Sequence, residues 1–188
     1  GCGKSTQARA LYRRLSQDGF GALLTREPGG TRLGERVRRH LKQNDGTQIS
    51  PLAELLLIDA ARAQLVSEVI CPALEAGRIV VCDRFTPSTL AYQGYGRGVD
   101  MDTLRAVNDA ATRGLAPDLI VLLDIPVEAG LSRKESRERD RFESESLAFH
   151  SRVRRGYLEM ARADPMRWLV VDGRLPRKAI GSAIWERV

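Results

Sequence analysis

The chain has 188 residues, of which 43% are hydrophobic and 29% are charged, and it carries a formal net charge of +6. These values are typical of a globular protein, and the length suits one domain. The apolar run of about 20 residues that a membrane helix needs does not occur, and no signal peptide is visible.

Cysteine content and charge narrow the classes of partner. Cys2, Cys71 and Cys82 are too few and too scattered for a disulfide framework or a zinc site, so we expect a reducing cytoplasm. The positive net charge favours anionic partners. Because the basic residues cluster around particular motifs, a small phosphorylated ligand fits better than nucleic acid, although charge alone does not separate the two.

Short apolar runs alternate with helical patterns along the chain. The runs predict buried strands at residues 21–25, 79–83, 119–124 and 168–172. Helical spacing predicts helices at about 4–18, 32–43, 51–76, 102–114, 126–135, 142–163 and 177–187. This alternation predicts a three-layer α/β domain over residues 1–188, with a parallel sheet covered on both faces. We expect a fifth strand ahead of Gly1.

The chain begins with the second half of a phosphate-binding loop. The residues Gly1-Cys2-Gly3-Lys4-Ser5-Thr6 fit the end of the pattern G-x-x-x-x-G-K-[ST], with the first glycine expected before Gly1. In this motif, backbone N–H groups and a lysine hold the phosphates of ATP, and the serine hydroxyl binds Mg²⁺. We therefore expect Lys4 to reach the β and γ phosphates and Ser5 to bind the metal. The alternative is a glycine-rich helix start with an exposed lysine.

A second motif follows the strand at 79–83. Asp83 and Arg84 end this strand, and a carboxylate beside a guanidinium there can hold Mg²⁺ and bind phosphate. Ser88 and then Tyr92, Gln93 and Arg97 follow in a glycine-rich stretch, where hydroxyl and amide groups can read a sugar or a base. The alternative is a surface turn with an ion pair. For Asp124 and Asp172, which end other strands, we favour a capping role.

Two further segments carry charge. Glu27 and Pro28 lie in a turn after the strand at 21–25, and Pro28 has the option of a cis bond. On the helix at 51–76, helical spacing places Arg62 on the apolar stripe, one turn after Ile58. Arg62 therefore faces a ligand or pairs with Asp59, and periodicity favours neither.

An arginine-rich stretch at about 133–143 joins two predicted helices. Arg133, Arg137, Arg139 and Arg141 predict a lid that brings positive charge to a transferring phosphoryl group. The alternative is a solvated charged helix face.

Taken together in this order, the motifs resemble those of the bacterial thymidylate kinases over nearly the whole chain. The points of likeness are the Gly3–Gln7 loop, the Arg26–Thr31 turn, Ala60–Gln64, Asp83-Arg84-Phe85 and Ala91 through Gly98. The resemblance implies a P-loop enzyme that moves the γ-phosphoryl group of ATP onto dTMP with Mg²⁺, giving dTDP and ADP in dTTP biosynthesis. It also implies a homodimer, without a nucleic-acid or membrane partner.

The resemblance implies a role for each matched residue. The ATP site would comprise Gly1, Cys2, Gly3, Lys4, Ser5, Thr6, Arg133, Arg137 and Arg141. The dTMP site would comprise Glu27, Pro28, Ile58, Arg62, Arg84, Ser88, Tyr92, Gln93 and Arg97, with Arg62, Arg84 and Arg97 on the phosphate. The catalytic groups would be Lys4, Asp83, Arg84, Arg137 and Arg139, and the metal ligands Ser5 and Asp83.

Two departures bear on substrate choice. Ile58 stands where family members usually stack an aromatic ring on thymine, and an aliphatic side chain covers a base without that stacking. The acidic residue of the family's phosphate loop would fall before Gly1. The runner-up is a P-loop kinase for another nucleoside monophosphate or a deoxynucleoside. Two other classes are a nucleotide switch and a nucleic-acid-binding domain. The switch is disfavoured because no Asn-Lys-x-Asp tetrapeptide occurs in the sequence.

Overall fold

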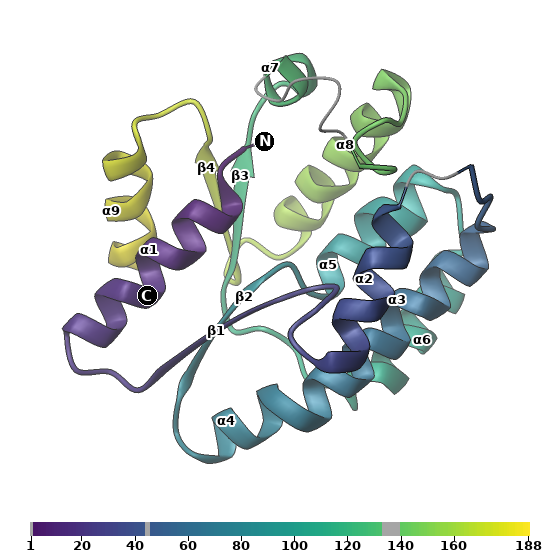
Figure 1. Ribbon diagram of the computed structural model, residues 1–188. Helices are drawn as coiled ribbons and strands as arrows, with labels where there is room; N and C mark the ends of the chain where they lie inside the picture. The colour runs from purple at the N-terminus through teal and green to yellow at the C-terminus, as the bar shows by residue number, and fades with distance from the viewer. Residues whose placement is uncertain (1, 44–45, 133–139) are drawn as a thin grey trace.

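The computed structural model describes residues 2–43, 46–132 and 140–188, and Figure 1 shows strands in the middle with helices on either side. Its strands are β1 (Ala22–Arg26), β2 (Ile79–Asp83), β3 (Ile120–Asp124) and β4 (Trp168–Asp172). Each matches a predicted strand to within one residue at either end. Continuous apolar runs buried by helices on both sides account for this agreement.

The strands form two parallel pairs. Strand β1 pairs with β2, with Arg26 opposite Asp83, and β3 pairs with β4, with Asp124 opposite Asp172. Within the described residues these pairs are separate two-stranded sheets, so the predicted five-stranded sheet is not confirmed. The parallel arrangement still brings the carboxyl ends of β1 and β2 to a common edge, where ligands bind in open α/β folds.

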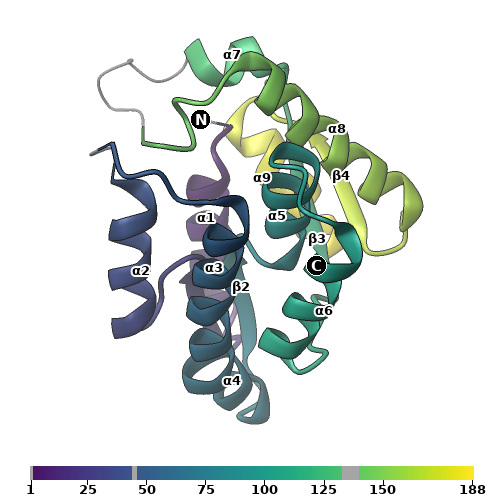
Figure 2. The ribbon, with the colours of Figure 1, turned by 90° about the vertical axis from the view of Figure 1, so that its right-hand side faces the viewer.

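Helices cover both sides of the strands, as Figures 1 and 2 show. On one side lie α1 (Lys4–Gln17) and α9 (Arg177–Arg187), which pack on each other and on the strands. On the other side lie α2 (Arg32–Lys42), α3 (Pro51–Leu65), α5 (Thr86–Thr89), α6 (Met101–Thr112) and α8 (Leu147–Ala163). Helix α4 (Cys71–Glu75) and α7 (Val127–Ser132) lie at opposite ends of the strands. Among the described helices, none is both long and apolar enough to cross a membrane.

Three helical features differ from the predicted elements. The helix expected at 51–76 contains a π-helical turn, η1 (Val66–Ile70), between α3 and α4. The helix expected from 142 begins at Leu147, because the Ser146 hydroxyl caps it by accepting from the Phe149 N–H. The glycine-rich stretch after β2 is itself helical: α5 continues into a second π-helical stretch, η2 (Leu90–Gly96). Its glycines are tolerated because they pack closely; a Cβ on Gly94 would meet the Met101 sulfur at 2.8 Å.

Candidate active site

The loop at the start of α1 lies against the end of β2. Gly3 has a φ of 89°, a left-handed conformation that favours glycine, and its carbonyl accepts from the N–H groups of Thr6 and Gln7. The hydroxyl of Ser5 donates to Asp83 Oδ2, so residues 78 positions apart are in direct contact. The Lys4 ammonium donates to the Cys2 sulfur at 3.4 Å. The predicted phosphate loop and the Asp83 motif therefore form one site; Gly1 lies outside the described residues.

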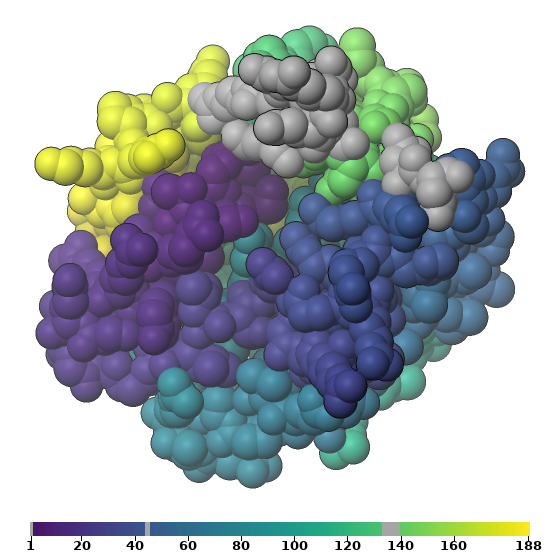
Figure 3. Space-filling view, in the orientation of Figure 1, coloured from purple at the N-terminus to yellow at the C-terminus, as the bar shows by residue number. Residues whose placement is uncertain are grey.

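Positive charge gathers beside this contact. Arg84 has a φ of 78°, unusual for a residue with a side chain, and its guanidinium donates to the Tyr92 hydroxyl at 3.3 Å and lies 4.9 Å from the Tyr92 ring centroid. Burial opposes ionisation of Tyr92, but the charges of Arg84 and Lys4 lower its pKa. In Figure 3 the surface is hollowed between the purple atoms of α1 and the blue atoms of α2.

Arg38 on α2 belongs to the same positive cluster, although the sequence reasoning missed it. Its guanidinium donates to the Pro28 carbonyl at 3.0 Å. Burial, and then the like charges of Arg26 and Arg84, lower the pKa of Arg38 against the opposing effects of Glu35 and Asp140. Like charges held together and partly out of water are costly unless an anion joins them. This edge of the fold is therefore suited to a phosphate group.

Aromatic residues surround Tyr92, whose ring lies against the Arg84 guanidinium. The Tyr157 hydroxyl, from α8, donates to Ser88 Oγ at 2.9 Å, and burial raises the pKa of Tyr157 to about 12. The Tyr92 ring makes edge contacts with Phe142, Phe149 and Tyr157 at centroid distances of 6.0–6.5 Å. Tyr92 and Ser88 are thus held by α8 and the turn before it, which the sequence pattern alone did not indicate.

Arg62 is buried in an ionic cluster and has 1% of its surface exposed. Its guanidinium donates to both oxygens of Glu27, to Asp59 Oδ1 at 2.6 Å and to Asn108 Oδ1. Burial raises the pKa of Glu27 and of Asp59, and Asp59 Oδ2 lacks a described partner. Of the two alternatives open from the sequence, the Asp59–Arg62 pair is therefore present.

The residues around Arg62 tie separate elements together. Glu27 precedes a cis peptide bond to Pro28, in the turn after β1, whereas Asn108 comes from α6. Ile58, one turn before Arg62 on α3, is 8% exposed. Asn108 was missed because a lone asparagine on a helix carries no periodic signal.

Gln93 and Arg97, which are predicted to bind the acceptor, both donate to a buried carboxylate that the sequence reasoning missed. Glu54 on α3 is fully buried and accepts from Gln93 Nε2 at 2.7 Å and from Arg97 Nε at 3.2 Å. It also accepts from Arg141 Nη2 at 2.5 Å. Of the four arginines predicted to form a lid, Arg141 alone is described; Arg133, Arg137 and Arg139 lie outside the described residues.

The expected capping roles hold for one of two aspartates. Asp172 accepts from the backbone N–H and the guanidinium of Arg174, which lowers the pKa of Asp172 to about 2. The Asp124 carboxylate instead takes two hydrogen bonds from Arg154 on α8, at 2.7 and 2.9 Å, and this pairing lowers the pKa of Asp124. The described contacts of the Asp124 carboxylate are thus with α8, and capping of the next helix or turn by Asp124 stays a prediction.

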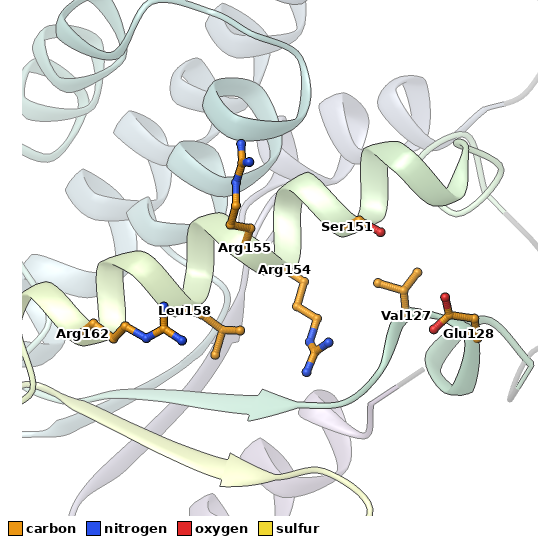
Figure 4. A pocket seen from close by; sticks show the side chains of 7 residues that line it. All are labelled: Val127, Glu128, Ser151, Arg154, Arg155, Leu158 and Arg162. Atoms are coloured by element: carbon orange, nitrogen blue, oxygen red, sulfur yellow. The ribbon is translucent and has the colours of Figure 1, made fainter.

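A separate cavity of about 280 Å³ lies between α7 and α8 (Figure 4). Arg154, Leu158 and Arg162 line it from α8, and Val127 and Glu128 from α7. It contains none of the predicted site residues. Since the guanidinium of Arg154 is already paired with a carboxylate, we place the candidate active site at the edge of β1 and β2 and not in this cavity.

A Gly-Lys-Ser turn that opens a helix against the carboxyl end of a parallel strand defines the class of P-loop nucleotide-binding proteins. The family model for Thymidylate kinase matches residues 1–184. The chain is 52% identical over 188 residues to a thymidylate kinase of Dehalococcoides mccartyi, covering 100% of this chain and 90% of that protein. It is 50% identical to one of Synechococcus sp., covering 100% and 89%.

A solved structure agrees with these sequence matches. The crystal structure of thymidylate kinase from Ehrlichia chaffeensis superposes with a TM-score of 0.82 at 31% identity, over 99% of this chain and 91% of that one. The chain therefore belongs to the thymidylate kinase family, and the predicted P-loop α/β fold is confirmed.

Proposed function

We propose that the protein is an ATP-dependent nucleoside monophosphate kinase that phosphorylates dTMP to dTDP. The observation that carries this proposal is the contact between Ser5 of the phosphate loop and Asp83 of β2, with Arg84 beside it. Family membership supports the same reaction and does not favour another acceptor. Phosphoryl transfer depends mainly on positioning and electrostatic stabilisation, which such a cluster provides.

On the donor side, we assign residues 1–6 to the phosphates of ATP, with the Lys4 ammonium as the charged group. The Ser5 hydroxyl and the Asp83 carboxylate are oxygen ligands in contact, which fits a hard cation such as Mg²⁺. Among the described residues, no group of three or more His, Cys, Asp or Glu side chains could hold a metal. Mg²⁺ needs only one or two protein ligands, together with phosphates and water. Bound Mg²⁺ would neutralise charge on the phosphates.

On the acceptor side, we assign the monophosphate to Arg84 together with Arg38. Burial, and then the positive charges of Arg26 and Arg84, lower the pKa of Arg38, and a bound phosphate would offset these charges. Tyr92 and Ser88, which α8 and the turn before it hold in place, would lie beside the sugar, and Ile58 would cover the base.

The remaining predicted residues take supporting roles in this proposal. The donors of Arg62 and Arg97 are engaged by carboxylates, so we propose that both shape the acceptor site more than they bind phosphate. Glu27 and Pro28 would hold the neighbouring turn through Arg62 and Arg38. The catalytic roles of Arg137 and Arg139 and the ATP contacts of Arg133, Arg137 and Arg141 stay predictions.

We further propose a cytoplasmic homodimer. Leu33 on α2 and Leu52 and Leu56 on α3 are 43%, 51% and 50% exposed, which leaves apolar surface on two adjacent helices. Light scattering coupled to gel filtration tests this proposal. A dimer that Leu56→Glu converts to a monomer supports it, and a monomer at all concentrations contradicts it.

Two substitutions test the assigned roles. Lys4→Ala should abolish ADP production with dTMP, whereas the exposed Lys178→Ala control should behave as the unaltered chain does. Arg84→Ala should raise the KM for dTMP and lower kcat, because charge pairing and positioning are both lost. An Arg84→Ala variant with unaltered kinetics would contradict the acceptor site.

A further inference from the structure

Glu54 is an unusual residue for its position. It lies in the first turn of α3, after the Ser50 cap, where a glutamate ordinarily faces solvent and is favoured by the helix dipole. Here its side chain is 0% exposed. Glutamate is almost never fully buried unless it is paired. Its partners therefore indicate why it is buried.

The partners come from two other segments. Gln93 and Arg97 belong to η2 and the residue that ends it, whereas Arg141 follows the undescribed stretch at 133–139. Arg141 also donates to the Leu41 carbonyl at 3.0 Å, and Arg97 to Glu145 at 2.6 Å. Two carboxylates thus face two guanidiniums, so the cluster is balanced in charge. The Gln93 amide is the uncharged partner of Glu54.

The contact fixes which end of the Gln93 amide faces Glu54. A carboxylate only accepts hydrogen bonds, so the NH₂ group of Gln93 must turn toward it, as the 2.7 Å distance from Nε2 shows. The carbonyl Oε1 is then the end that Gln93 can offer to a ligand. Gln93 is 1% exposed, so the amide has little room to exchange its two ends.

We propose that Glu54 is a positioning residue for acceptor specificity. It holds Gln93 as a hydrogen-bond acceptor that reads an N–H donor on the base of the acceptor nucleotide. Thymine carries a hydrogen on ring nitrogen N3, whereas cytosine has an unprotonated nitrogen there. A site with a fixed acceptor oxygen therefore favours the first base and leaves the second unpaired. This inference rests on the proposed function, because it assumes a nucleoside monophosphate in the site.

The test compares kcat/KM for dTMP and dCMP in four chains. Glu54→Gln lets the amide turn either way, and Gln93→Met keeps the size while removing the amide. We expect each variant to lower the preference for dTMP by about tenfold or more, which is the range for losing a hydrogen bond in specificity. The KM for ATP should not change in Gln93→Met, whereas Glu54→Gln also loses a charged partner of Arg141, which the resemblance assigns to ATP. Glu68→Gln, an exposed glutamate on η1, is the matched control and should keep the preference.

A double variant separates positioning from general structural damage. If Glu54 acts through Gln93, adding Glu54→Gln to Gln93→Met should leave the dTMP preference where Gln93→Met alone put it. A further fall in preference would overturn the proposal, and so would full preference in Gln93→Met, a result that needs no folded Glu54 variant. If the unaltered chain does not phosphorylate dTMP, the proposed function itself fails and this inference with it. If it does and both single variants keep their preference, only the inference fails.

Discussion

Replacing Arg62 by methionine removes a guanidinium that two buried carboxylates share. Arg62 is 1% exposed, Asp59 3% and Glu27 4%, so the remaining carboxylates would face each other away from water. Breaking a buried ion pair by removing one partner costs about 3–5 kcal/mol. For a chain of this size each kcal/mol lowers Tm by about 2–4 °C, so Arg62→Met should lower Tm by roughly 6–20 °C.

Urea unfolding followed by circular dichroism at pH 7 measures this cost. The matched control is Arg105→Met on α6, whose ion pair with Asp102 has side chains 64% and 90% exposed. Exposed pairs contribute little, so the control should change the free energy of unfolding by less than about 1 kcal/mol. If Arg62→Met costs no more than the control, the cluster does not stabilise the fold and our account of it is wrong.

Three further variants test the site. Arg38→Ala should raise the KM for dTMP at least tenfold while leaving the KM for ATP unchanged, since a charged hydrogen bond contributes about 1.5–3 kcal/mol; equal changes in both constants would remove Arg38 from the acceptor site. Ile58→Phe should lower the KM for dTMP by about two- to tenfold, as aromatic contacts add about 0.5–1.5 kcal/mol, and unchanged or poorer kinetics would place the base elsewhere. Burial raises the pKa of Asp59, so the folded chain binds this proton more tightly than the unfolded chain and loses stability as pH rises above the ordinary value of 3.8. Asp59→Asn cannot ionise, so its Tm relative to that of the unaltered chain should be higher at pH 7 than at pH 4, and a pH-independent difference would refute this.

The strands were predictable because each is a continuous apolar run between turns. The helical stretch η2 was not, since glycines at 94 and 96 predict a turn unless close packing against Met101 and Phe149 is known. The expected fifth strand is not among the described residues, so the sheet as a whole remains a prediction.

The site residues were likewise predictable where a sequence motif marks them, and not where a partner distant in the sequence holds them. A sequence motif predicts Ser5 and Asp83, whose contact the structure supplies. Helical periodicity placed Arg62 on a buried face of α3. It could not show whether Arg62 contacts a ligand or pairs with a carboxylate, because the partner Glu27 lies 35 residues away. Glu54 was missed for the same reason: its partners lie 39, 43 and 87 residues along the chain, and local patterns carry no signal over such distances.

The most direct test of the central claim is ADP release by the full chain with ATP and Mg²⁺, compared across dTMP, dUMP, CMP, AMP and GMP as acceptors. Our account predicts the highest kcat/KM with dTMP, and loss of that activity in Lys4→Ala. Turnover with dTMP no better than with the other acceptors would contradict it.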